Sequence, residues 1–307
     1  MTTVTSPRGV VQKTWSAGRR RFEDLFDQLG LLLTIVWTLP FFIIPFGLMV
    51  LYSFSTQDYL TAKITFGWTI DAWQALSDPI VYRTVIRSIT LSTSATIGCA
   101  IIGYPLAYFV ARRAGRFRNV ALLLIIIPFW ISFIIRTYAW VNILGDRGPI
   151  NNFLTKIGLI DSPLPLLDNT SGIAIGILYG YLPLMVFPIY VALERIDERV
   201  LESARDLGAS AFSTFRRVTF PQALPGLVAG CTIVWVPALG EYVIPEILGG
   251  GKTYMIGNVI AQRFTISFQW PVGAALAVAL VLFALTTLAS VFFFLGRERL
   301  GRAVRTS

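Results

Sequence analysis

The chain has 307 residues, of which 55% are hydrophobic and only 14% are charged, and its formal net charge is +9. A soluble domain carries about 25% charged residues, so this composition excludes an ordinary soluble fold and favours an integral membrane protein. The sequence contains no histidine, which excludes a histidine-based metal site, a histidine proton relay and a Ser/His/Asp triad; we predict no metal site.

The beginning of the chain is basic and amphipathic. Large apolar side chains alternate there with charged ones: Trp15, Phe22, Phe26 and Leu29 lie among Arg19–Arg21, Glu23, Asp24 and Asp27. The pattern is typical of a helix lying in a membrane interface, and the alternative is a solvated basic tail. We predict a cytoplasmic tail with an interfacial helix over 1–30, a membrane domain over 31–295 and a basic cytoplasmic tail over 296–307.

Six stretches are long and apolar enough to cross a bilayer as helices, which takes about 20 residues each. They predict an all-α integral membrane fold with six transmembrane helices. The third contains Arg136, and the fifth is free of charge only from Ala223 to Gly240. The predicted spans are 31–54, 89–110, 120–144, 172–193, 223–247 and 272–295.

The distribution of basic residues predicts the orientation. Eighteen of the 26 Lys and Arg residues lie in the two tails and in the loops after the second and fourth spans. Because cytoplasmic loops collect Lys and Arg, both termini and these two loops are expected to be cytoplasmic. The charge then reflects topology and anionic lipid, and we do not expect nucleic-acid binding.

Prolines interrupt the predicted spans repeatedly. Each removes a backbone donor and bends its helix, and in membranes such breaks survive where neighbouring helices or a cavity satisfy the freed carbonyls. The set favours kinked helices around a pathway, although proline is also simply commoner in membrane helices. The prolines are Pro40, Pro45, Pro105, Pro128, Pro183, Pro188, Pro225 and Pro237.

The longest polar segment between two spans is residues 194–222. Asp197 can cap a helix that starts at Glu198, and Gly208 can end it. Ser210 can start a second helix, which we expect Pro221 to end. The first helix carries one apolar face, formed by Val200, Leu201, Ala204 and Leu207. Such a face suits a groove on a partner, and the alternative is that it lies on lipid or on its own helix ends.

This segment resembles the coupling loop of ABC importer permeases. That family's pattern is Glu-Ala-Ala-x3-Gly-x9-Ile-x-Leu-Pro, and the spacing matches from Glu202 through Gly208 to Pro221, with Ser203, Val218 and Phe220 as mild departures. The resemblance implies a type I ABC importer permease whose loop docks on a cytoplasmic ABC ATPase dimer. The residues that it places in this contact are Glu202, Ala204, Asp206, Leu207, Gly208, Ala209 and Pro221.

Further strings are similar to the spermidine/putrescine permeases: residues 127–130, 136–140, 151–154, 181–185 and 240–246. This resemblance implies a non-catalytic, multi-pass subunit in a bacterial inner membrane. A periplasmic binding protein would deliver polyamine to it, and a second homologous permease would complete the pathway. The chain itself would bind no cofactor, since ATP and Mg would be held by the ATPase.

Candidate solute contacts lie near the outer ends of the spans. Charged groups at membrane depth are costly and are usually functional, and Glu241, in the predicted fifth span, lies about 28 Å from that span's cytoplasmic end at ~1.5 Å per residue. Carboxylates beside aromatic rings suit a polycation, through charge pairing and cation–π attraction. Alternatively, Glu241 pairs with Arg136 or Arg263. The candidates are Glu241, Glu246, Asp146, Tyr138, Trp140, Trp130, Tyr181 and Tyr242.

Two other classes of function fit the sequence less well. A secondary transporter would often show internal repeats, which are not evident here, and it would leave the charged loop unexplained. An intramembrane enzyme would need paired catalytic groups, and we find none with convincing spacing. Residues 249–253 resemble the end of a phosphate-binding loop, but Glu246 occupies the position of the motif's first glycine. A related importer for another small solute remains the main alternative.

Overall fold

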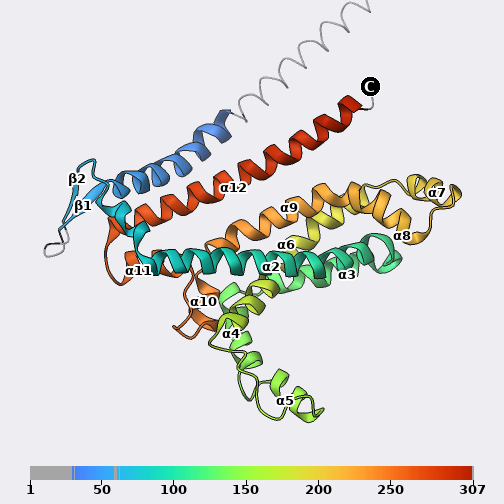
Figure 1. Ribbon diagram of the computed structural model, residues 1–307, viewed down its shortest axis with the longest axis horizontal. Coiled ribbons are helices and arrows are strands. Elements are labelled where there is room, and N and C mark those ends of the chain that lie inside the picture. The colour runs from blue at the N-terminus through green and yellow to red at the C-terminus, as the bar shows by residue number, and fades with distance from the viewer. Residues whose placement is uncertain (1–29, 31, 59–60, 62, 306–307) are drawn as a thin grey trace, which may run out of the picture.

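The computed structural model describes residues 30, 32–58, 61 and 63–305, and within them it is almost entirely helical (Figure 1). Five helices are long and apolar enough to cross a membrane: Leu32–Ser53, Pro79–Arg112, Thr170–Glu194, Ala211–Leu239 and Trp270–Phe293. A bent pair of helices supplies a sixth candidate. The prediction of an all-α membrane protein is therefore confirmed, whereas the predicted interfacial helix in 1–30 lies outside the described residues.

The third predicted span is not one straight helix. It consists of α3 (Arg118–Ile126), the 3-10 turn η3 (Ile127–Trp130) and α4 (Phe133–Leu144), with a bend of 94° between the two halves. Pro128 stands in the first turn of η3, and Ile131 is extended at φ −86° and ψ 136°. The hydropathy of residues 120–144 is continuous, but the chain turns sharply within them.

Arg136 holds this bend. Its Nη1 atom donates to the backbone oxygen of Pro128 at 2.7 Å, and its guanidinium lies over the rings of Phe129 at 5.2 Å and Phe133 at 5.5 Å. The side chain is buried, with 8% of the residue exposed. The charge in the third span therefore serves the fold, because it binds the carbonyl at the break, which otherwise accepts only from the amide of Ile131 at 3.4 Å.

The centre of the molecule is a bundle of three helices, α2 (Pro79–Arg112), α6 (Thr170–Glu194) and α9 (Phe220–Leu239). Glycine lets α9 approach α6 closely, as small residues do between membrane helices. A Cβ atom on Gly226 would lie 2.4 Å from the oxygen of Pro188, and one on Gly230 would lie 2.8 Å from the sulfur of Met185. Met185 is fully buried at this contact.

Short elements gather at one end of the bundle. Strand β1 (Ser55–Gln57) pairs antiparallel with β2 (Ile64–Phe66), and the 3-10 helix η1 (Asp71–Ser77) follows. The side-chain amide of Gln57 joins this hairpin to the start of α12 (Trp270–Arg305). It donates to the backbone oxygen of Phe268 at 2.8 Å and accepts from the backbone amide of Trp270 at 3.1 Å. Helices α10 (Val243–Leu248) and α11 (Ile256–Thr265) lie nearby.

The opposite end carries α7 (Glu198–Asp206), α8 (Ala211–Thr214) and the loop from α2 to α3, which includes η2 (Gly115–Phe117). The C-terminal end of α12 points to the same side in Figure 1. Helix α5 (Pro149–Lys156) projects from the far end of α4. The basic loops that follow the second and fourth spans are thus neighbours in space.

Candidate functional site

The segment 194–222 forms the helix–glycine–helix unit that its sequence predicts. The Asp197 carboxylate accepts from the Arg199 amide at 3.0 Å and caps α7. The Ser210 hydroxyl accepts from the Ser213 amide at 3.2 Å and caps α8. Between them, Gly208 has φ of +80°, a conformation that favours glycine because it lacks a Cβ atom. This predicted local fold is confirmed.

The apolar face of this unit is largely uncovered. Leu207 is 89% exposed, Phe212 is 70% exposed and Val200 is 43% exposed. Leu201 and Phe215, in contrast, pack on the buried cluster formed by α2, α6 and α9. The unit therefore rests on the bundle by one side and presents Leu207 and Phe212 outward. Of the other residues expected in the partner contact, Glu202, Asp206 and Pro221 are exposed and Ala204 and Ala209 are half-buried.

Pro221 does not end the second helix, so that prediction is wrong. Helix α8 continues through a π-helical turn, η4 (Phe215–Thr219), directly into α9, and Pro221 stands in the first turn of α9. The Phe220 amide bonds to the oxygen of Phe215, five residues back. Proline clashes with the carbonyl four residues before it in a regular helix, and a widened turn accommodates it. The helix–glycine–helix unit is consequently continuous with the fifth membrane helix.

Two arginines, at the end of α2 and the start of α3, contact the end of α6 where α7 begins. Arg118 forms an ion pair with Glu194, and its guanidinium lies 5.2 Å above the ring of Tyr190. Arg112 donates to two backbone oxygens of the same region. The sequence reasoning missed these contacts, because a basic residue beside a membrane span is already explained by topology.

At the other end of the bundle, Glu241 lies just past the end of α9. Its Oε1 atom accepts from the amides of Tyr242 at 3.0 Å and Val243 at 2.9 Å, and Tyr181 donates to Oε2 at 2.5 Å. The residue is only 6% exposed. The predicted fifth span, 223–247, is therefore two helices, α9 and α10, and the Glu241 carboxylate caps the second.

Neither arginine considered as a partner of Glu241 takes that role in the structure. Arg136 binds the Pro128 oxygen, and Arg263 donates to the Gln269 side chain at 2.5 Å. The negative charge of Glu241 is instead stabilised by amides and one hydroxyl. These donors are neutral, so no positively charged side chain offsets the formal charge of this carboxylate.

A second carboxylate lies beside the first. Glu246, on α10, is exposed and accepts from the Asn258 side chain at 2.9 Å. Asn258 is 1% exposed and also donates to the oxygen of Tyr242 at 2.8 Å. The Tyr242 residue is 52% exposed. Glu241, Glu246, Tyr181 and Tyr242 thus form one group, which we call the acidic group.

The remaining solute candidates belong to the bent third span. Trp140 packs edge-on against Tyr179, with ring centroids 5.1 Å apart, in the same cluster as Tyr181. Tyr138 is 58% exposed and Trp130 is 77% exposed. Asp146 is exposed just beyond α4. The structure therefore brings Trp140 to the buried neighbourhood of the acidic group and leaves the other three on the surface of the bent segment.

The glycines of 249–253 have a conformational role. Gly250 and Gly251 have φ of +59° and +68°, and the Lys252 amide bonds to the oxygen of Gly249 at 3.1 Å. They build the tight turn between α10 and α11. This turn follows a short helix, whereas a phosphate-binding loop follows a strand and opens a helix.

Comparison with known proteins agrees with this geometry. Residues 103–301 match the family model described as binding-protein-dependent transport system inner membrane component. The chain is 37% identical to the spermidine/putrescine transport system permease protein PotB of Haemophilus influenzae, over 86% of this chain and 92% of that protein. It is also 37% identical to PotB of Escherichia coli, over 82% and 92%.

Solved structures show the same fold at lower identity. A bacterial ABC transporter that imports the acidic polysaccharide alginate has a chain that aligns with a TM-score of 0.68 at 19% identity, over 94% of this chain and 98% of that one. The alginate transporter in complex with its substrate-bound periplasmic protein aligns with a TM-score of 0.66 at 18% identity, over 87% and 93%.

Proposed function

The chain belongs to the binding-protein-dependent transport system inner membrane components, and we propose that it forms half of a polyamine pathway through the bacterial inner membrane. It is a multi-pass ABC importer permease. The single observation that carries the choice of cargo is 37% identity with the spermidine/putrescine permease PotB over most of both chains. The acidic group supplies chemistry that suits a polycation.

We call residues 194–222 the coupling unit, and we propose that it docks on a cytoplasmic ABC ATPase dimer, which holds the ATP and Mg. What supports this is the uncovered apolar face around Leu207 and Phe212, with the charged residues Glu202 and Asp206 exposed beside it. An amphipathic helix of this kind fits a groove. Because α8 runs into α9 without a break, movement of the docked unit would reach the bundle directly.

The remaining partners are a second homologous permease and a periplasmic binding protein. The alginate transporter with the same fold is itself found with a substrate-bound periplasmic protein. In this arrangement the binding protein delivers solute at the end that carries β1, β2 and α10. Glu241, Glu246, Tyr181, Tyr242, Trp140, Tyr138, Trp130 and Asp146 would line or flank the entrance, and the chain would bind no cofactor of its own.

The proposal is tested by reconstitution in proteoliposomes with the ATPase, the second permease and the binding protein. Spermidine or putrescine, loaded on the binding protein, is expected to stimulate ATP hydrolysis and to accumulate inside. The matched control is an uncharged diol of the same length as putrescine, which should do neither. Stimulation by another small solute and by no polyamine would overturn the cargo assignment. Uptake without any ATPase would indicate a secondary transporter.

A further inference from the structure

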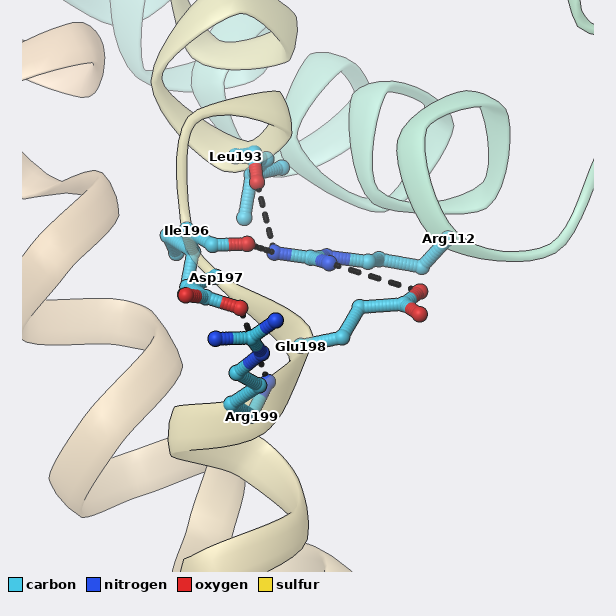
Figure 2. Close-up of polar contacts among 6 residues, drawn as sticks. All are labelled: Arg112, Leu193, Ile196, Asp197, Glu198 and Arg199. Atoms are coloured by element: carbon cyan, nitrogen blue, oxygen red, sulfur yellow. Dashed lines mark hydrogen bonds and ion pairs between the residues drawn. The ribbon is translucent and has the colours of Figure 1, made fainter.

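One side chain from α2 fills the junction between α6 and α7. We call residues 195–197 the α6–α7 joint, since α6 ends at Glu194 and α7 begins at Glu198. Arg112 is the last residue of α2. Its Nη2 atom donates to the oxygens of Leu193 at 2.7 Å and Ile196 at 2.8 Å, as Figure 2 shows.

The same guanidinium also reaches the coupling helix. Its Nη1 atom lies 3.9 Å from an oxygen of Glu198, the first residue of α7. The Arg112 side chain is 10% exposed, whereas that of Glu198 is 82% exposed. The carboxylate contact is therefore open to solvent, and such ion pairs contribute little. The stronger interactions of Arg112 are its hydrogen bonds to the two backbone oxygens.

These oxygens are strong acceptors for a physical reason. The Leu193 oxygen belongs to the last turn of α6, where carbonyls lack a donor from a continuing helix and form the negative end of the helix dipole. Besides Arg112, it accepts from the amide of Ile196 at 3.3 Å, and Ile196 lies two residues beyond the end of α6. Leu193 is fully buried and Ile196 is 5% exposed, so water has little access to these two residues. A planar guanidinium can donate to both oxygens from one nitrogen while its charge faces the dipole.

From this geometry we propose that Arg112 is a positioning residue that makes α2 move with the coupling unit. The inference rests on the proposed docking of that unit on an ATPase. At its other end, α7 connects through Gly208 to α8 and so to α9. Arg112 gives the first end of α7 an equivalent attachment to α2 and α6. Without it, only apolar packing links the joint to α2, and we expect α7 to move more freely relative to α2.

The other polar contact near the α6–α7 joint, made by Arg118, is weaker. Arg118 and Glu194 form an ion pair, and 38% of each side chain is exposed. Exposed pairs hold less firmly than buried, charge-assisted hydrogen bonds. Of the two polar contacts, that of Arg112 is therefore the stronger one, and it adds to the apolar packing of Ile196 in the cluster that includes Val110 of α2.

The test compares Arg112→Gln with Arg113→Gln in the full reconstituted complex. Arg113 is the next residue, is exposed and has the same charge, so the two variants change composition equally. The readout is polyamine taken up per ATP hydrolysed, for equal amounts of assembled complex. We expect Arg112→Gln to lower this ratio about tenfold, as loss of a charge-assisted hydrogen bond predicts, and Arg113→Gln to preserve it.

A merely structural role would reduce the amount of complex and leave the ratio of uptake to hydrolysis unchanged; that result would overturn the proposal. If Arg112→Gln does not assemble, Arg112→Lys decides the question against Arg113→Lys. Lysine keeps the charge but not the planar fork, so an intermediate ratio supports the proposal and a wild-type ratio contradicts it. Failure of the proposed function would appear differently, as absent ATP-driven uptake in the wild type and in both Arg113 controls.

Discussion

Glu241 combines a structural and an electrostatic role at a single residue. Its carboxylate accepts from backbone amides at the start of α10 and from the Tyr181 hydroxyl. These donors explain why a carboxylate can be buried here, since an unsatisfied buried charge would cost several kcal/mol. They do not supply a positive charge. The residue therefore fixes the geometry of the acidic group and gives it a negative potential.

Two substitutions separate these roles. Glu241→Gln retains an acceptor oxygen for the amides but removes the charge, so we expect complex assembly to persist and the KM for polyamine uptake to rise about 3- to 10-fold. Glu241→Ala removes both, and leaving the amides without an acceptor should cost a further ~1–3 kcal/mol of stability. Uptake kinetics and the yield of folded complex measure the two effects. An unchanged KM in Glu241→Gln would refute the electrostatic role.

Gly208 offers a second test at the residue scale. Its φ is +80°, and no atom lies within 4 Å of a Cβ placed on it, so a substitution there meets backbone strain and no steric clash. Valine is β-branched and opposes the left-handed conformation by roughly 1–2 kcal/mol. Gly208→Val should uncouple ATP hydrolysis from uptake while the protein remains in the membrane. Asparagine tolerates this conformation, so Gly208→Asn is the matched control.

Two measurements on the same vesicles test the effect of the Gly208 substitutions. ATP hydrolysis by the bound ATPase and polyamine uptake should separate in Gly208→Val and stay proportional in Gly208→Asn. Normal transport by Gly208→Val would contradict the assignment of this turn to coupling.

At the scale of elements, we expect the close packing of α9 on α6 to determine how α9 transmits movement. A Cβ on Gly226 would lie 2.4 Å from the Ala192 Cβ and from the Pro188 oxygen, so even alanine cannot enter without shifting a backbone. Gly47 lies in another membrane helix, and a Cβ there meets nothing within 4 Å. The two positions therefore form a matched pair for the same substitution.

We expect Gly226→Ala to destabilise the protein by about 1–3 kcal/mol, the usual cost of overpacking. Gly47→Ala should be neutral or mildly stabilising, because alanine favours a helix over glycine by about 1 kcal/mol. The midpoint of thermal unfolding in detergent measures both. Equal midpoints for the two variants would show that α6 and α9 are not held by this contact.

Hydropathy predicted the membrane helices well because burial in lipid depends on composition summed over about 20 residues. The same sum contains no information about the direction of the chain, so it could not reveal the bend between α3 and α4. Capping residues such as Asp197 and Ser210 were predictable from local chemistry. The contact of Arg112 was not, since it joins residues far apart in the chain. The role of Glu241 as a cap required knowing that α9 ends at Leu239.

At the scale of the whole molecule, two long helices have little cover. In Leu32–Ser53, none of the residues in the most apolar stretch is buried. In Trp270–Phe293, only 11% of the residues in the corresponding stretch are buried. Lipid or the proposed second permease must cover these faces, because both are rich in large apolar side chains. The coupling unit and the C-terminal end of α12 lie toward one end, and the hairpin β1–β2 lies at the other (Figure 1). The proposal assigns the first end to the cytoplasm.

This orientation can be tested by cysteine labelling in right-side-out membrane vesicles. The two native cysteines, Cys99 and Cys231, are buried and half-buried, and they would first be replaced by alanine. Asp161→Cys, in the loop after α5, should react with a membrane-impermeant maleimide, whereas Leu207→Cys should react only in inverted vesicles. Both positions are exposed, so reactivity reports the side of the membrane and not burial.

Adding the ATPase to inverted vesicles extends the same measurement to the docking surface. Leu207 is 89% exposed in the isolated chain, and a groove that receives α7 would cover it. Labelling of Leu207→Cys should therefore slow when the ATPase binds, while labelling of Arg113→Cys, an exposed position outside residues 194–222, should not change. Reaction of Leu207→Cys in right-side-out vesicles would reverse the orientation and exclude docking on an enzyme that uses cytoplasmic ATP.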